Sequence, residues 1–278
     1  MQNNICLFDE SFHKDFIKNY SLLLQISENS FDYIIYDIFN NKYIALASNT
    51  LNDSEDLIDC IDKDEILSLS FKKIRIFYIN QKSTLVPVPL FKPEEKENIF
   101  SFNHFLEKDE VVLSDNVLNI DSVNLFSINK DLKNFIDKKF SNSNLYHFST
   151  ELINIFYNIG KNQSEKSVYI HIHSNTYEVL IFEGKKIILY NSFNYQTKED
   201  FIFYLLYVFE QLELNNEEQK VNICGEVSVK SQIYEIISKY IRNINFLKRN
   251  QTSIYSYKLE DIEPQRFFNL FNSKLCEL

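Results

Sequence analysis

Few residues of this chain have the types and spacing that chemistry requires, and the clearest of them are His171 and His173. Side chains two positions apart on a β-strand point to the same face, so this pair has a geometry that can hold zinc or copper. No third ligand is identifiable from the sequence. We therefore expect two surface or hydrogen-bonded imidazoles and no metal site.

The other reactive side chains do not form a catalytic set. His104 and His147 are isolated from any assignable nucleophile, and the chain has no Gly-x-Ser-x-Gly elbow, His-Glu-x-x-His helix or glycine-rich P-loop. Glu199 and Asp200 suit the first turn of a helix better than acid–base chemistry. The sequence predicts no catalytic residue and no cofactor. Packed, reduced thiols are expected at the four scattered cysteines, Cys6, Cys60, Cys224 and Cys276.

The composition argues against two kinds of partner. The 278 residues include 29 Lys+Arg and 39 Asp+Glu, a net charge of −10, whereas nucleic-acid binding depends on basic residues. The longest apolar run, 201–209, is nine residues long, about half of the roughly 20 that span a bilayer. The first ten residues lack a signal-peptide pattern. We expect a cytoplasmic protein without nucleic-acid binding or membrane insertion.

The strands and helices that position these residues follow from the hydrophobic pattern. In the first part of the chain, three strands separated by short turns precede a helix after Asp53 and a buried strand. The predicted strand ranges are 20–27, 31–38, 42–47 and 74–79.

The same order returns in the second part of the chain. Three strands lead into a helix that Thr197 opens, with Asp200 in the position of a capping box. The run 201–209 is apolar on every side, so we expect this helix to be sandwiched between other elements. The predicted strands are 167–173, 177–182, 186–191, 221–224 and 244–247, with a second helix from Ser228.

This repetition predicts an α/β protein with two similar halves, each a mixed sheet covered by helices. The first half spans 1–148, with an irregular insertion around 80–121, and the second spans 149–278. A last helix over 264–275 is expected to cross back over the other half. Such a duplication is typical of the actin-like ATPase fold, whose two ribonuclease-H-like halves normally hold a nucleotide between them.

Several short phrases resemble one family. They are Thr84-Leu85-Val86-Pro87 with Leu90-Phe91, Val123-Asn124-Leu125-Phe126, Asn191-Ser192-Phe193 with Tyr195 and Glu199-Asp200-Phe201, and Ile223-Cys224-Gly225-Glu226. They are similar to an uncharacterised family, a domain of unknown function found mainly in Bacteroidota. The resemblance covers roughly 20–247 and implies an actin-like ATPase fold without an assigned activity.

An actin-like ATPase would need two hairpins whose backbone amides wrap phosphates, each with a glycine and an aspartate. The first equivalent turn has Glu28 and Asn29 at its tip, and the second has Ser174 and Asn175. The turn that would receive the adenosine keeps a single glycine, Gly225. We therefore predict a degenerate nucleotide site. Bulky side chains on the expected crossing helices point the same way: Phe156, Tyr157, Phe267 and Phe268.

The segment 84–91 is a candidate for partner docking. Pro87 and Pro89 favour an extended backbone, which would offer a row of apolar side chains. The segment is expected either to dock a partner or to cover the first half as a buried loop. The candidate docking residues are Leu85, Val86, Pro87, Leu90 and Phe91.

For function, the leading hypothesis is a non-catalytic pseudo-ATPase that serves as a cytoplasmic scaffold or adaptor. Its partner is an unidentified protein, and a homodimer is left open. The alternative is a nucleotide-binding actin-like ATPase or sugar-kinase-like enzyme with atypical phosphate loops. An enzyme of another class that uses the face of His171 and His173 ranks third.

Overall fold

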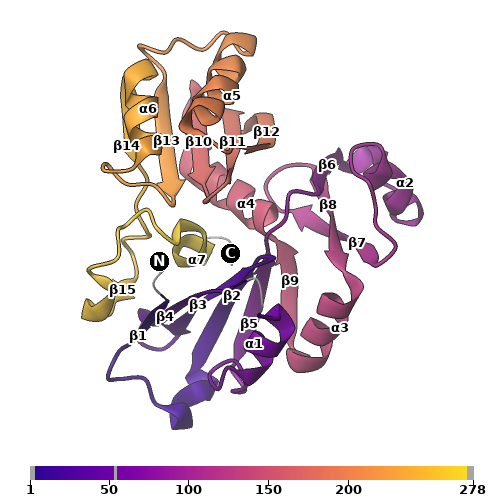
Figure 1. Cartoon of the computed structure of the whole chain (residues 1–278), viewed down its shortest axis with the longest axis vertical. Coiled ribbons are helices and arrows are strands. Elements are labelled where there is room, and N and C mark those ends of the chain that lie inside the picture. The colour runs from indigo at the N-terminus through magenta and orange to yellow at the C-terminus, as the bar shows by residue number, and fades with distance from the viewer. Residues whose placement is uncertain (1–3, 53–54, 274–278) are drawn as a thin grey trace. The chain divides into compact units, whose positions relative to one another are not determined.

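The computed structural model describes residues 4–52 and 55–273 (Figure 1). The chain forms two compact units. The first comprises Met1–Leu152 and Thr252–Asp261, and the second comprises Ile153–Gln251 and Ile262–Leu278. The chain thus comes back to the first unit over Thr252–Asp261, which we call the return segment. Asp53, Leu275 and Cys276, to which the sequence analysis referred, lie outside the described residues.

The first unit is built on a seven-stranded sheet with the order β1-β4-β3-β2-β5-β9, with β15 also paired to β4. Strands β2, β3 and β4 form an antiparallel meander, and β5 and β9 continue the sheet in parallel. Helices α1 (Leu57–Lys63) and α3 (Lys130–Lys139) pack on its apolar face through Ile61 and Ile136. The strands are β1 (Ile5–Phe8), β2 (Tyr20–Ile26), β3 (Ser30–Asp37), β4 (Lys42–Thr50), β5 (Lys73–Tyr78), β9 (Ser143–His147) and β15 (Ile254–Tyr255).

The second unit repeats this plan with a five-stranded sheet in the order β12-β11-β10-β13-β14. Helices α5 (Lys198–Gln211) and α6 (Gln232–Tyr240) pack on the face that carries Val168 and Ile170. The strands are β10 (Lys166–Ile172), β11 (Thr176–Glu183), β12 (Lys186–Asn194), β13 (Lys220–Gly225) and β14 (Asn243–Phe246). In both units the meander's first strand lies at the centre, next to a parallel strand. The predicted α/β fold with two similar halves is confirmed.

A three-stranded sheet with the order β6-β8-β7 lies within the first unit. Its strands are β6 (Ser83–Pro87), β7 (Glu110–Val117) and β8 (Ser122–Asn129), with α2 (Lys96–Ser101) packed on it through Phe100. The insertion around 80–121 is therefore regular, whereas the sequence predicted an irregular segment. The hydrophobic pattern of the sequence was misleading here because β7 buries a polar residue, Asp115, between its apolar residues.

Helix α5 has the predicted capping box between Thr197 and Asp200, but it is not sandwiched. Its outer face exposes Phe203 (65%), Tyr204 (40%) and Tyr207 (53%), so that prediction was wrong. Only one side of the helix packs against the sheet, and the aromatic residues on the other side face solvent. Helix α6 begins at Gln232 after the N-cap Ser231, later than the predicted start at Ser228.

The final helix, α7 (Phe268–Asn272), is shorter than the predicted 264–275 and belongs to the second unit. Phe267 precedes it with a left-handed backbone (φ 52°), which sets the start of the helix after the predicted first turn. Helix α4 (Phe148–Gly160) precedes the second sheet, and its Phe156 ring lies 5.7 Å from that of Phe268. The remaining helical turns are η1 (Lys14–Asn19), η2 (Val88–Leu90), η3 (Pro93–Glu95) and η4 (Tyr257–Leu259).

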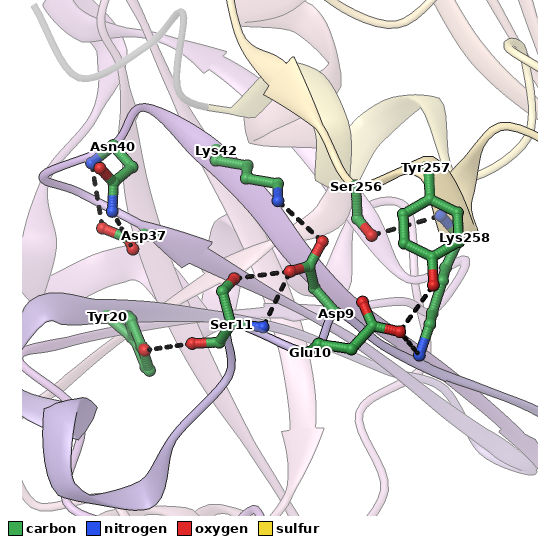
Figure 2. A network of polar contacts seen from close by, with 10 residues as sticks. All are labelled: Asp9, Glu10, Ser11, Tyr20, Asp37, Asn40, Lys42, Ser256, Tyr257 and Lys258. Carbon is green, nitrogen blue, oxygen red and sulfur yellow. Dashed lines mark hydrogen bonds and ion pairs between the residues drawn. The ribbon is translucent and has the colours of Figure 1, made fainter.

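The return segment is held on the first unit by backbone pairing and ring stacking, and it also makes solvent-exposed polar contacts with Glu10. Strand β15 pairs in parallel with β4, and the Tyr255 ring stacks on Tyr43 with 5.1 Å between centroids. The Tyr257 hydroxyl donates to Glu10 at 2.6 Å, and Lys258 forms an ion pair with the same carboxylate at 2.9 Å (Figure 2). The segment is therefore an integral part of the first unit.

Candidate functional site

The turn after β13 is built around Gly225. Its φ of +94° is one that L side chains rarely adopt, and an added Cβ would lie 2.2 Å from the carbonyl oxygen of Ile172. The Gly225 amide donates to the carbonyl of Gln265 at 3.0 Å. This glycine, predicted at a degenerate nucleotide site, is explained by the close approach of two backbone segments. Its amide already has a partner within the protein.

The β2–β3 hairpin is closed by its own hydrogen bonds. The Ser27 amide donates to the Ser30 carbonyl at 2.9 Å, and the two hydroxyls lie 2.6 Å apart. Glu28 and Asn29 are exposed at the tip. The Asn29 carbonyl accepts from the amide of Leu51 at 2.8 Å, so the end of β4 supports the turn.

The β10–β11 hairpin has the same construction. The His173 amide donates to the Thr176 carbonyl at 2.8 Å, and Ser174 and Asn175 are exposed at the tip. The Asn175 carbonyl accepts from the amide of Tyr195 at 3.0 Å, as Asn29 does from Leu51 in the first unit. The Tyr195 hydroxyl also donates to the His173 carbonyl at 2.5 Å.

Neither hairpin contains a residue in the left-handed region. Among the residues that the structure describes, positive φ angles occur at Asn41, Gly184, Glu213, Gly225 and Phe267. One common form of backbone nest for an anion places right- and left-handed residues side by side. The two turns that the sequence predicts as phosphate sites do not form nests of this kind.

Acidic side chains lie close to both hairpins. Burial, and then the negative charges of Glu110 and Glu28, raise the pKa of Tyr78 at the end of β5. Burial, and then the charge of Glu226, raise the pKa of Tyr195 to about 12. A phosphate at either turn would meet the negative charge of Glu28 or Glu226, whereas Glu110 is paired with Lys82 at 2.8 Å.

A second site, on the β10–β11 hairpin, brings His171 and His173 together with Glu178. The distance from His173 Nε2 to Glu178 Oε2 is 3.2 Å, and that from His171 Nδ1 to the same oxygen is 3.6 Å. One ligand atom from each side chain lies within 4.8 Å of the other two. His171 and Glu178 are both 5% exposed, and His173 is half-buried.

The charges of this cluster favour an ionised carboxylate and a neutral imidazole. Burial, and then the neighbouring His173, lower the pKa of His171 to about 4. Burial alone would raise the pKa of Glu178, but the charge of His173 and hydrogen bonds from both histidines together lower it to about 2. His171 is therefore neutral and Glu178 ionised, which are the protonation states in which these two side chains bind metal ions.

Glu178 was not among the residues predicted from the sequence, although a signal for it was present. A two-residue turn at Ser174 and Asn175 places position 173 opposite 176 and therefore His171 opposite Glu178, the register that β10 and β11 adopt. Residues directly opposite in an antiparallel pair share a face. Continuing the register by two residues past the turn would have identified the third side chain.

Comparison with known proteins identifies the family and the fold. Residues 9–244 match the family described as a protein of unknown function, DUF3822. The chain belongs to the DUF3822 family. A Bacteroides thetaiotaomicron VPI-5482 protein with an actin-like ATPase fold and unknown function is similar, with 26% identity and a TM-score of 0.76. The match covers 85% of this chain and 93% of that protein, and it confirms the predicted actin-like fold.

A structure of the PilM–PilN type IV pilus biogenesis complex is also similar in fold. Its TM-score is 0.58 at 11% identity, and the match covers 92% of this chain and 98% of the other. A search of curated proteins gave no match. The resemblance to a family of unknown function, predicted from short phrases of sequence, is thus confirmed at the level of family and fold.

The bulky residues expected on crossing helices pack inside the second unit of this DUF3822 protein. Phe156 is fully buried and stacks on Tyr169 of β10, with 4.8 Å between ring centroids. Phe268 is also buried, and Tyr157 lies edge-on to Phe182. The Arg266 guanidinium lies 4.9 Å from the centre of the Phe267 ring. The rings of Phe156, Tyr169, Phe182 and Phe268 belong to the core on the second face of the β10–β13 sheet, whereas Phe267 is half-buried.

His147 has a serine neighbour that the sequence did not reveal. The Ser149 hydroxyl lies 2.7 Å from His147 Nδ1, and Asn80 Oδ1 lies 3.0 Å from Nε2. Ser149 and His147 are 0% and 1% exposed. A serine and a histidine so enclosed cannot meet a substrate, and the contacts link β9 and α4 to the three-stranded sheet. The His104 ring lies 3.0 Å from the Ser83 carbonyl.

The candidate docking segment of the DUF3822 chain is divided between core and surface. Val86 is 6% exposed within the cluster of Phe100 and Leu125, and Phe91 packs partly against the same cluster. Leu90 is 69% exposed and Pro87 is exposed, while Leu85 is half-buried. Val86 therefore cannot meet a partner, because its side chain points into the core. The exposed part follows β6, which is an edge strand of its sheet.

Two further expectations concern membranes and thiols. Among the described residues, no helix is both long enough and apolar enough to cross a membrane. Cys6, Cys60 and Cys224 are free thiols, but Cys6 is exposed, so the prediction of a packed thiol was wrong at that position. Cys224 is fully buried, and burial raises its pKa well above the ordinary value, so it is a poor nucleophile.

Proposed function

We propose that this DUF3822 chain is a non-catalytic protein of the actin-like fold, whose role is to bind another protein and not to hydrolyse ATP. The observation that carries the proposal is the backbone of the two hairpins, which contain no left-handed residue. Phosphoryl transfer depends almost entirely on positioning the phosphates and stabilising their charge. A chain without backbone contacts to the phosphates therefore lacks the main means of catalysing it.

The surroundings of the hairpins support the same proposal. Glu28 adds negative charge near the first turn, and Glu226 does so near the second. The amide of Gly225, in the turn that would receive an adenosine, donates to Gln265. These features disfavour a bound nucleotide.

Two observations favour a protein as the partner. The segments that follow β6 and α2 expose large apolar side chains: Val88 (52%), Leu90 (69%), Phe102 (86%) and Phe105 (74%). Contiguous patches of such side chains mark protein interaction sites. One structure of similar fold belongs to the PilM–PilN complex, an assembly of proteins. The composition further supports a cytoplasmic location without nucleic-acid binding, and the partner is either a different protein or a second copy of the chain.

A thermal-shift titration with ATP and Mg²⁺ tests the nucleotide half of the proposal. If ATP bound with a Kd of about 10 μM, about 1 mM ATP would raise the free energy of unfolding by about 2.7 kcal/mol. We expect no rise beyond that produced by Mg²⁺ with tripolyphosphate, the control for non-specific anion effects. Stabilisation by ATP but not by tripolyphosphate would instead support the alternative, an atypical ATPase or sugar-kinase-like enzyme.

Affinity purification from the native host tests the partner half. Leu90→Glu should remove a bound protein while leaving the thermal unfolding of the chain unchanged, because Leu90 is 69% exposed. Phe39→Glu is the matched control, since Phe39 is 77% exposed at the β3–β4 turn. If the wild type and both variants retained the partner equally, the exposed residues that follow β6 would have no role in binding it.

A further inference from the structure

We propose that His171, His173 and Glu178 form a binding site for a divalent transition-metal ion, with Zn²⁺ the ion that suits the donor set best. The site involves two strands of one hairpin in the second unit. It is independent of the proposed function, because a metal ion held there could serve either a binding protein or an enzyme.

The placement of the three side chains follows from the sheet. His171 lies on β10, and His173 is the first residue after that strand, where its amide still pairs with the Thr176 carbonyl, so the two histidines share a face. Glu178 is the register partner of His171 on β11. Two neighbouring strands therefore present two imidazoles and one carboxylate to the same small volume. The His171 and His173 rings are 4.5 Å apart between centroids.

Two of the three distances between ligand atoms are close to those around a bound metal ion. Zn²⁺ binds nitrogen and oxygen ligands at about 2.0–2.2 Å, so neighbouring ligands of a tetrahedral ion are about 3.4 Å apart. Glu178 Oε2 lies 3.2 Å from His173 Nε2 and 3.6 Å from His171 Nδ1. An ion can be accommodated with small side-chain rotations, since all three ligand atoms lie within 4.8 Å of one another.

The backbone around the site is held in place before any ion binds. The ladder between β10 and β11 continues as far as the pair of Ile172 and Tyr177, and the amide of His173 donates to Thr176. The carbonyl of His173 accepts from the Tyr195 hydroxyl at 2.5 Å. Sites carried on such fixed strands hold ligand atoms more accurately than sites on loops.

The exposure of the three side chains supports the binding of an ion and also indicates the route by which the ion would enter. His171 and Glu178 are each 5% exposed, so little water would screen the attraction between the Glu178 carboxylate and a divalent cation held there. His173, the most accessible of the three, lies next to the exposed hairpin tip and marks the way in.

The donor set selects the class of ion. Two imidazoles and a carboxylate suit Zn²⁺, Fe²⁺, Co²⁺ and Ni²⁺, whereas Mg²⁺ and Ca²⁺ prefer oxygen ligands alone. Cys224 is the register partner of His171 on β13, but its thiol lies 3.7 Å from the Ile170 carbonyl and is not one of the three grouped ligands. The ion would therefore have three protein ligands, with a remaining position for water or another ligand.

Calorimetric titration of the EDTA-treated full chain with Zn²⁺ tests the proposal. We expect one Zn²⁺ per chain, no heat with Mg²⁺, and an increase in melting temperature with Zn²⁺. His173→Ala and Glu178→Gln should each weaken Zn²⁺ binding by at least about tenfold, because even residues that only support a ligand contribute that much. Co²⁺ should give visible d–d absorption that both variants lose.

Matched controls separate the site from general effects of substitution. His13→Ala removes an exposed histidine in the first unit, and Cys224→Ala alters the buried neighbour of His171, so both should bind Zn²⁺ as the wild type does. The metal-free melting temperatures of all variants show whether each one folds, and Glu178→Gln preserves the shape of the side chain. Absence of Zn²⁺ binding by the wild type, or equal binding by His173→Ala and Glu178→Gln, would overturn the proposal.

Discussion

Gly225 and Ile172 lie opposite each other on the parallel strands β13 and β10, and their backbones approach so closely that no side chain fits at position 225. A Cβ there would lie 2.2 Å from the Ile172 carbonyl oxygen and 2.9 Å from its nitrogen. The neighbouring Glu226 amide donates to that carbonyl at 2.7 Å. The glycine thus maintains the sheet at its junction with the following turn, with no need of a ligand to explain it.

Gly225→Ala should therefore destabilise the protein by at least about 3 kcal/mol, since it combines an unfavourable φ with a backbone collision. Gly184→Ala is the matched control. Its φ is also positive, at +58°, but the nearest atom to an added Cβ lies 3.7 Å away, so we expect a loss of about 1–2 kcal/mol. Urea unfolding measures both, and equal losses would show that the close approach to Ile172 contributes nothing.

Thr197→Ala should lower the free energy of unfolding by about 1 kcal/mol, the usual cost of losing an N-cap. The Thr197 hydroxyl accepts from the Asp200 amide at 3.1 Å, and the Asp200 carboxylate accepts from the Thr197 amide at 2.9 Å. Thr197→Ser keeps the hydroxyl and should retain most of the stability. Chemical denaturation of the two variants provides the comparison, and an equal loss in both would argue against the capping box.

Much of the architecture could be predicted because local pattern and tertiary structure agree. Alternation marks β2, β3 and β4 within a few residues of their ends, and the polar turns between them fix the meander. The capping box of Thr197 and Asp200 is local as well. Glu178 was also within reach, because the two-residue turn of its hairpin determines the register.

The remainder depends on contacts between distant parts of the chain. The return segment pairs Ile254 with Lys42 through a two-residue strand, which no local period can indicate. Likewise, the sequence of an all-round apolar helix such as α5 is the same whether its outer side is covered by another element or faces solvent. The exposure of Phe203 and Tyr207 was therefore not predicted. The buried contact of Ser149 with His147 arises from a polar core between elements, which hydrophobic patterning does not encode.

Asp115 should make the protein less stable as the pH rises from about 4 to about 7. The carboxyl group accepts from the His147 amide at 2.6 Å and from the Thr150 hydroxyl at 2.9 Å, but burial dominates and raises its pKa from 3.8 to about 7. The folded protein then binds a proton that the unfolded chain has lost, so stability is full below pH 4 and declines through pH 7.

In Asp115→Asn this decline should disappear. The difference in unfolding free energy between wild type and variant should shift by up to about 4 kcal/mol between pH 4 and pH 7, with the wild type favoured at the lower pH. Asp121→Asn, at the exposed β7–β8 turn, controls for the loss of one negative charge. Urea midpoints across this range measure the effect, and parallel pH profiles for wild type and Asp115→Asn would contradict it.

Asp9 should have the opposite effect to Asp115: its contribution to stability should fall as the pH falls below about 4. It is 7% exposed, and its carboxylate lies 2.7 Å from Lys42 Nζ and 2.6 Å from the Ser11 hydroxyl (Figure 2). Burial alone would raise the pKa of Asp9, but hydrogen bonds from Lys42, Ser11 and Ser256 lower it well below 3.8. Because the folded-state pKa is depressed, the contribution to stability is present above about pH 4 and is lost as the pH falls below it.

Asp9→Asn should therefore cost about 2 kcal/mol at pH 7, the usual value of hydrogen bonds to a charged group, and progressively less below pH 4. Glu10→Gln is the matched control, since its contacts with Tyr257 and Lys258 are solvent-exposed and should contribute little. Ser256 comes from the return segment, so limited proteolysis should cut that segment faster in Asp9→Asn than in Glu10→Gln. Equal cleavage rates, together with a pH-independent cost, would mean that Asp9 does not hold the return segment in place.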